Sequence, residues 1–242
     1  MKICVAQTRP VKGDIEANLY CHEKFIKTAV SVGTDLIVFP ELSITGYEPE
    51  LVKELATTRD DIRFDVFQRI ADAERITIGI GLPILADNGI RISQVYFQPG
   101  KLREVYSKMF LHSSEDEYFI RGDRYISLRI GNANIVPAIC YELSVVEHAE
   151  QAATSGADIY AVSVVEGNIE KAIERLTNVA TEYCMTVMMA NAVGKTGDYE
   201  CPGRSSIWSN KGLLVGQLGD SHQEILIFDT DTGEITRREI ES

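Results

Sequence analysis

The sequence predicts an α/β domain in which mixed β-sheets are covered by helices. Short runs of β-branched and aromatic residues alternate along the chain with longer amphipathic segments that carry helix caps. Gly-containing turns at 99–101 and 131–133 each join two such runs and predict β-hairpins, so antiparallel pairs are expected in the sheets. The 242 residues contain no linker, internal repeat or low-complexity segment, and a single domain spanning 1–242 is therefore expected.

The expected elements follow one another along the whole chain. Strands are expected at 2–7, 35–39, 77–82, 91–98, 102–107, 127–130, 134–139, 159–165, 186–191, 206–209, 213–218 and 224–229. Helices are expected at 14–32, 60–74, 147–155 and 168–183. Asp14 is a suitable N-cap for the first helix, and Gly33 follows its end, where a left-handed backbone is favoured. Ser144 and Glu147 have the spacing of a capping box, which predicts that the third helix begins there.

The composition argues against several classes of protein. The formal net charge of -12, without a Lys/Arg cluster, argues against a nucleic-acid partner. No apolar run is long enough to cross a membrane, and Met1–Gln7 is too short for a signal segment, so no membrane partner is expected. The four histidines lack metal-ligand spacing, and P-loop and dinucleotide-binding motifs are absent, so no metal or cofactor is expected.

The five cysteines are odd in number and lack C-x-x-C spacing, which predicts free thiols in a reducing cytoplasm. Cys4 and Cys184 have apolar neighbours and are expected to be buried. Cys21 is expected on a helix. Cys201 precedes a proline, and we expect it on a loop, as the more reactive thiol outside the functional site.

Cys140 ends the apolar run Ile135–Ile139, which predicts a short buried strand. With a helix predicted to begin at Ser144, the thiol is expected at a strand end just ahead of a helix N-terminus. The positive field of such a terminus favours the thiolate, which would make the cysteine reactive. Taken alone, the same run also fits a buried structural cysteine.

Two other expected strand ends carry ionisable side chains. One strand ends in Pro-Glu at Glu41, another ends at Lys108, and Glu115 follows a few residues later. Because open α/β sheets gather ligand sites at strand C-termini, these groups are expected to approach Cys140. Each of them taken alone could be a solvated surface charge, and Glu115 lies in an acidic run.

Together these blocks resemble the nitrilase superfamily of carbon–nitrogen hydrolases, whose catalytic set is Glu, Lys and Cys. The resemblance is carried by Phe-Pro-Glu-Leu…Thr-Gly-Tyr around Glu41, Tyr-Ser-Lys-Met-Phe-Leu around Lys108 and Ile-Cys-Tyr-Glu around Cys140. The family's second glutamate precedes a Tyr-Phe…Gly-Asp segment. Glu115 fits that place, and Glu117, which is nearer the aromatic pair, is the alternative if the register is shifted. The resemblance covers essentially the whole chain. It implies a four-layer α-β-β-α sandwich and a homodimer or higher homo-oligomer.

The resemblance implies hydrolysis of a small linear amide, ω-amide or carbamoyl compound through a cysteine thioester. Cys140 would be the nucleophile, Glu41 the base for the thiol and later for water, and Lys108 the group that stabilises the oxyanion. Glu115 would position the substrate or support Lys108. The backbone N–H of Tyr141 is expected to be the second oxyanion donor.

Substrate contacts are expected from loops near the mouth of the pocket, where the resemblance places Tyr47, Val165 and Glu166. If Glu166 faces the pocket, it would favour a substrate that carries an amine. It could equally begin the next helix, where acidic residues are favoured. Glu142 would orient the nucleophile loop beside the substrate site. His148 is expected at the surface, with contact to a glutamate or a substrate carboxylate as the alternative.

Other functions remain open at this stage. Nitrile hydrolysis would use the same residues, and a Cys–His thiol hydrolase would use His112 or His148. A binding module could keep the fold without catalysis. A glutaminase could supply ammonia to a partner, which we would expect to be a separate polypeptide. In an oligomer, the segment Arg237–Ser242 is the part expected to depend on a partner subunit.

Overall fold

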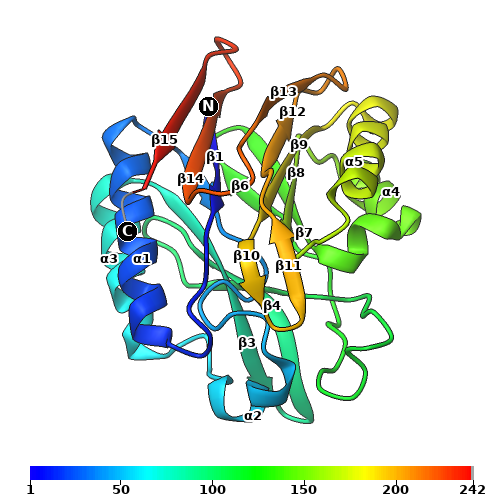
Figure 1. Ribbon diagram of the computed structural model, residues 1–242. Helices are drawn as coiled ribbons and strands as arrows, with labels where there is room; N and C mark the ends of the chain where they lie inside the picture. Colours follow the sequence, from blue (N-terminus) through cyan, green and yellow to red (C-terminus); the bar gives the residue numbers. More distant parts are fainter. Residues whose placement is uncertain (241–242) are drawn as a thin grey trace.

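The computed structural model describes residues 1–240, in which two β-sheets pack face to face (Figure 1). In spatial order the first sheet contains β15 (Ile235–Glu239), β14 (Glu224–Asp229), β1 (Lys2–Gln7), β2 (Leu36–Val38), β3 (Thr77–Ala86), β4 (Gly89–Phe97) and β5 (Glu104–Ser107). The second contains β13 (Leu214–Gln217), β12 (Ser206–Trp208), β9 (Thr186–Asn191), β8 (Ile159–Val164), β7 (Ala133–Ile139) and β6 (Leu128–Ile130). A separate hairpin is formed by β10 (Val193–Thr196) and β11 (Tyr199–Pro202).

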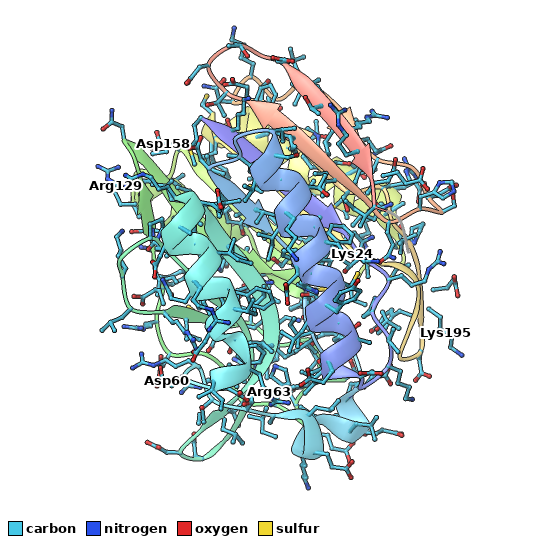
Figure 2. All side chains as sticks on the ribbon, turned by 90° about the vertical axis from the view of Figure 1, so that its left-hand side faces the viewer. Lys24, Asp60, Arg63, Arg129, Asp158 and Lys195 are labelled. Carbon is cyan, nitrogen blue, oxygen red and sulfur yellow. The ribbon has the colours of Figure 1, made fainter. Side chains whose placement is uncertain are left out.

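Helices cover the outer face of each sheet. The first sheet is covered by α1 (Ile15–Ser31) and α3 (Asp65–Glu74), which lie side by side in Figure 2. The second is covered by α4 (Val146–Thr154) and α5 (Ile169–Tyr183), on the opposite side of the molecule in Figure 1. The four-layer α-β-β-α sandwich expected from the sequence is therefore confirmed.

Burial on both faces explains why the strands are apolar at successive positions. In β1, Ile3 and Val5 point into the core between the two sheets, while Cys4 and Ala6 pack toward α1 and α3. Alternate side chains thus enter different cores, and neither face of the strand meets water. A third core lies between the second sheet and α4 and α5, where Trp208 is fully buried.

The sheet topology brings the expected functional segments to one end of the sandwich. Strands β1, β2 and β3 are parallel, and so are β7, β8 and β9. Because β4 is antiparallel to both β3 and β5, the last strand runs in the same direction as β3. Glu41, Lys108, Cys140 and Val165 accordingly follow the C-terminal ends of β2, β5, β7 and β8.

Several boundaries differ from the expected ones. The segment expected as a helix from residue 60 begins with a 3₁₀ turn at Ile62–Phe64, because the Asp61 carboxylate accepts the backbone N–H of Arg63. Strand β3 continues to Ala86 because it pairs with β4 along its full length. A short helix, α2 (Val52–Leu55), follows a 3₁₀ turn at Pro49–Leu51 and was not expected.

The predicted capping box at Ser144 and Glu147 is wrong. A 3₁₀ helix occupies Cys140–Ser144, and α4 begins at Val146 with Val145 as an N-cap that makes no side-chain hydrogen bond. The Ser144 hydroxyl instead accepts a hydrogen bond from Arg175 of α5. The Ser144 side chain, which the local sequence predicts as a helix cap, is therefore bound by the neighbouring helix instead.

The C-terminal segment pairs within its own chain. Strand β15 hydrogen-bonds antiparallel to β14, and the last two residues of the segment 237–242 lie outside the described residues. None of the described helices has the length and apolarity needed to cross a membrane.

Candidate active site

A cavity of about 450 Å³ opens at the end of the sandwich where the functional segments gather. Its wall includes Lys108, Glu115 and Cys140 from the predicted catalytic set. The predicted substrate-contact residues found in its wall are Tyr47, Tyr141, Val165 and Glu166. The cavity therefore unites residues that the sequence separates by more than a hundred positions.

Lys108 lies between two carboxylates. Its Nζ donates hydrogen bonds to Glu41 Oε1 at 2.8 Å and to Glu115 Oε1 at 2.7 Å. All three side chains are at least 98% buried. Because a buried charge is costly without a partner, this arrangement argues against three incidental surface charges.

Glu115 is held by further donors. The Tyr47 hydroxyl donates to Glu115 Oε1 at 2.8 Å, and the backbone N–H of His112 donates to Oε2 at 2.8 Å. Its neighbours Asp116 and Glu117 are exposed. The acidic run is thus divided between one buried carboxylate and a solvated surface.

The shared lysine sets the proton affinities of the site. Burial raises the pKa of Glu41 to about 7, with the Lys108 charge acting in the opposite direction and the Glu115 charge adding to the rise. Burial by itself lowers the pKa of Lys108, but the charges of Glu41, Cys140 and Glu115 reverse this effect and raise the pKa overall. Lys108 is therefore a cation in the site, while Glu41 can gain or lose a proton near neutral pH.

Cys140 lies at a tight turn. It has a left-handed backbone, with φ 45°, where β7 ends and the 3₁₀ helix begins. Its thiol donates weakly to the Val165 carbonyl, with a sulfur-to-oxygen distance of 3.7 Å. A positive φ is unusual for a side chain of this kind and is found at functional turns, where surrounding contacts hold it.

The expectation of a favoured thiolate at Cys140 is wrong for the resting site. Burial raises the pKa of the thiol well above its ordinary value, and the Glu41 charge raises it further, against the Lys108 charge. The capped helix that was to supply a positive field does not begin at this turn. The thiol proton must therefore be removed during the reaction.

Glu142 is fully buried and does not line the cavity. Its Oε2 accepts the backbone N–H of Ile139 at 2.7 Å, and its Oε1 accepts the backbone N–H of Met109 at 2.6 Å and the hydroxyl of Tyr106 at 2.8 Å. Burial raises the pKa of this carboxyl to about 7. Glu142 therefore links the residue after Lys108 to the residue before Cys140 without lining the cavity.

The expectation of a surface His148 is wrong. The ring is fully buried and bonds to the hydroxyls of Tyr106 and Tyr160, each at 2.7 Å. Burial lowers the pKa of His148 to about 4, so the ring is neutral. The other histidine considered for a Cys–His pair, His112, bonds through Nδ1 to Ser114. Among the described residues neither ring hydrogen-bonds to Cys140.

Glu166 faces the cavity, and the alternative that it begins the next helix is wrong, since α5 begins at Ile169 after the N-cap Asn168. Its Oε1 accepts the backbone N–H of Asn168 at 2.7 Å, just before α5. Its own N–H donates to the side chain of Asn191. One oxygen of the carboxylate is therefore already engaged at the helix start.

The hairpin of β10 and β11 supplies a cavity residue that was not predicted. Tyr199 lines the cavity and meets the ring of Tyr47 edge-on, with ring centroids 5.4 Å apart. The hairpin is fixed to this loop, since the Tyr47 N–H donates to Thr196 Oγ1 at 2.8 Å. Gly197 and Asp198 form a two-residue turn between short strands, a recognised hairpin signal from which Tyr199 could have been found.

Two expectations for cysteines outside the site are wrong. Cys201 is 2% exposed and lies in β11, and burial raises its pKa to about 12. Cys184 is exposed, in a left-handed conformation at the end of α5. Cys4 is buried and Cys21 lies on α1, as expected.

No group of three or more metal-ligating side chains converges within residues 1–240. The side chains of the site can themselves support nucleophilic attack by a thiol beside a buried carboxylate and a lysine cation.

Comparison with known proteins shows relatives along the whole chain. The chain is 25% identical over 251 residues to a glutamine-dependent NAD(+) synthetase of Thermotoga maritima, in an alignment covering 98% of this chain and 43% of the synthetase. It is 26% identical to a Staphylococcus aureus protein named hydrolase in agr operon, covering 98% of this chain and 94% of that protein. The chain therefore spans less than half of the synthetase.

Among solved structures, the amidase from Nesterenkonia sp. AN1 in complex with butyramide superposes with a TM-score of 0.85 at 23% identity, covering 94% of this chain and 89% of that one. A likeness at this identity shows the shared fold. The carbon-nitrogen hydrolase family matches residues 2–239. The protein therefore belongs to the carbon–nitrogen hydrolases of the nitrilase superfamily.

Proposed function

We propose that the protein hydrolyses a small non-peptide amide through a thioester on Cys140 and releases ammonia or an amine. The observation that carries this proposal is the position of Lys108, hydrogen-bonded to both Glu41 and Glu115 in the wall that also holds Cys140. A buried base, a fixed cation and a thiol are the three groups that acyl transfer to cysteine requires.

In the first half of the reaction, Glu41 takes the thiol proton as Cys140 sulfur attacks the carbonyl carbon. The raised pKa of Glu41, about 7, makes the carboxylate a usable base near neutral pH. The oxyanion that forms accepts hydrogen bonds from Lys108 and from the backbone N–H of Tyr141. Glu41 then gives its proton to the leaving nitrogen, the carbon–nitrogen bond breaks, and a thioester remains.

In the second half, Glu41 takes a proton from water while the water oxygen attacks the thioester carbon. The carbon–sulfur bond breaks, the acid leaves, and the proton returns to the sulfur of Cys140. Glu115 acts as a positioning residue throughout, because it holds Lys108 and receives the hydroxyl of Tyr47.

The test is ammonia release from a panel of small amides, carbamoyl compounds and nitriles. Wild-type protein is compared with Cys140→Ala and with Cys184→Ala, which removes an exposed thiol outside the cavity. Release that is lost only in Cys140→Ala, with an acyl adduct on Cys140 by intact mass, supports the proposal. Release that persists in Cys140→Ala contradicts it.

Glutamine belongs in the panel because of the relatives. The chain matches glutamine-dependent NAD(+) synthetases of Thermotoga maritima and Aquifex aeolicus over 43% and 44% of their lengths. A glutaminase activity is therefore the second candidate. A preference for glutamine over simple amides would support it.

A further inference from the structure

The cavity wall contributed by α5 carries two cations. Lys171 and Arg175 both line the cavity and are four residues apart on the helix, so they lie on the same helical face. Ser144, at the end of the nucleophile turn, completes this part of the wall. This wall belongs to the cavity that also holds Cys140.

Neither cation is neutralised by a carboxylate among the described residues. Arg175 is half-buried, and its Nη1 donates to the Ser144 hydroxyl at 2.5 Å, which orients the guanidinium without compensating its charge. Two acids line the same cavity: Glu115 is paired with Lys108, and Glu166 accepts a hydrogen bond from the backbone N–H of Asn168. By contrast, Arg204 forms an ion pair with Glu170, an acidic residue of α5.

An oriented, partly buried guanidinium without an ion-pair partner is suited to a carboxylate ligand. Its planar N–H groups match the two carboxylate oxygens, and partial burial strengthens the attraction. In a chain of formal net charge -12, two cations without an ion-pair partner in the cavity that also holds the candidate nucleophile favour an anionic ligand there.

We propose that Arg175, assisted by Lys171, binds a carboxylate at the far end of the substrate, so that the preferred substrates are monoamides of small dicarboxylic acids, including their α-amino derivatives. The inference rests on the proposed function, which places the amide carbon at Cys140. The two cations would hold the carboxylate, whereas the amine of an α-amino derivative is the group that Glu166 would favour.

The test compares succinamate with butyramide, which are matched in chain length and differ in a terminal carboxylate against a methyl group. The ratio of their kcat/KM values is measured for wild type, Arg175→Gln, Arg175→Lys and Lys171→Gln. Arg69→Gln, an exposed arginine on α3 outside the cavity, is the matched control for net charge.

We expect wild type to favour succinamate, and Arg175→Gln to lower the ratio roughly tenfold to a hundredfold through KM, since hydrogen bonds between charged groups have this strength. Arg175→Lys should retain part of the preference, and added salt should weaken it. Arg69→Gln should match wild type. An equal fall for both substrates in Arg175→Gln would mean a structural role and overturn the inference, as would an unchanged ratio.

A binding measurement separates this inference from the proposed function. Succinamate and butyramide are titrated calorimetrically into Cys140→Ala with and without Arg175→Gln. If wild type hydrolyses neither amide, the proposed function fails for this substrate class. Succinamate binding that depends on Arg175 would then still support the carboxylate site, and equal or absent binding of the two compounds would overturn it.

Discussion

The carboxylate of Glu142 accepts the backbone N–H of Met109 at 2.6 Å, although 33 positions separate the two residues. The other oxygen of Glu142 accepts the N–H of Ile139, the residue before the nucleophile. One buried side chain thus fixes the distance between the segment that carries Lys108 and the turn that carries Cys140. The position of Lys108 relative to Cys140 therefore depends on a residue that does not line the cavity.

Replacing Glu142 with alanine should reduce both stability and turnover. The change leaves the N–H groups of Ile139 and Met109 buried without their acceptor, and each such loss costs about 1–3 kcal/mol. Urea unfolding and kcat are measured beside Glu150→Ala, an exposed acid on α4. Equal unfolding midpoints for the two variants would contradict this role.

The activity should rise with pH through the neutral range. Glu41 must be ionised to accept the thiol proton, and its pKa of about 7 means that protonation removes the base below that pH. The measurement is kcat/KM against pH from 5 to 9. Its acidic limb should have a midpoint near 7, and Glu41→Gln should lose most of the activity at every pH. A flat profile from pH 5 to 9 would exclude Glu41 as the titrating base.

The convergence of the site could be predicted from the sequence because its residues follow strand ends. The strand patterns before Glu41, Lys108 and Cys140 identify those ends. Strands β2 and β7 pair in parallel with their neighbours, β5 runs in the same direction as β3, and the packing of the two sheets brings the three ends together. The first helix was also predictable, since Asp14 caps it and Gly33 follows it with a positive φ. These are local signals that agree with the tertiary structure.

What could not be predicted depends on contacts between distant segments. Strand β15 is largely exposed and shows no apolar alternation, so only its pairing with β14 defines it. The resting protonation of Cys140 follows from burial and from Glu41, which local sequence around the cysteine does not contain. Ser144 has the spacing of a capping-box residue, yet its hydroxyl accepts a hydrogen bond from Arg175 instead. In each case a partner far along the chain overrides the local preference.

The cysteines should differ sharply in reactivity toward iodoacetamide. Cys184 is exposed and should be alkylated in the folded protein, whereas Cys201 is buried with a pKa raised to about 12 and should be protected. Peptide mass spectrometry at neutral pH would record both sites, with urea-unfolded protein as the control in which all thiols react. Faster modification of Cys201 than of Cys184 in the native protein would contradict the burial of Cys201.

The contact between the β10–β11 turn and the Tyr47 loop should be sensitive to a single methyl group. Gly197 has φ 54°, and a Cβ there would lie 2.3 Å from the Tyr47 carbonyl oxygen. Gly131 has nearly the same φ, 56°, but a Cβ there meets nothing within 4 Å. The pair therefore separates the backbone cost of alanine from the cost of displacing the loop.

Gly131→Ala should lose about 1–2 kcal/mol of unfolding free energy, the ordinary cost of a left-handed alanine. Gly197→Ala should lose more, because the clash must also move the turn away from Tyr47. Since Tyr47 donates to Glu115, which holds Lys108, this variant should also have a lower kcat. Unfolding curves and amide turnover measured together would test both effects. If Gly197→Ala matched Gly131→Ala in both, the hairpin would have no part in positioning the lysine.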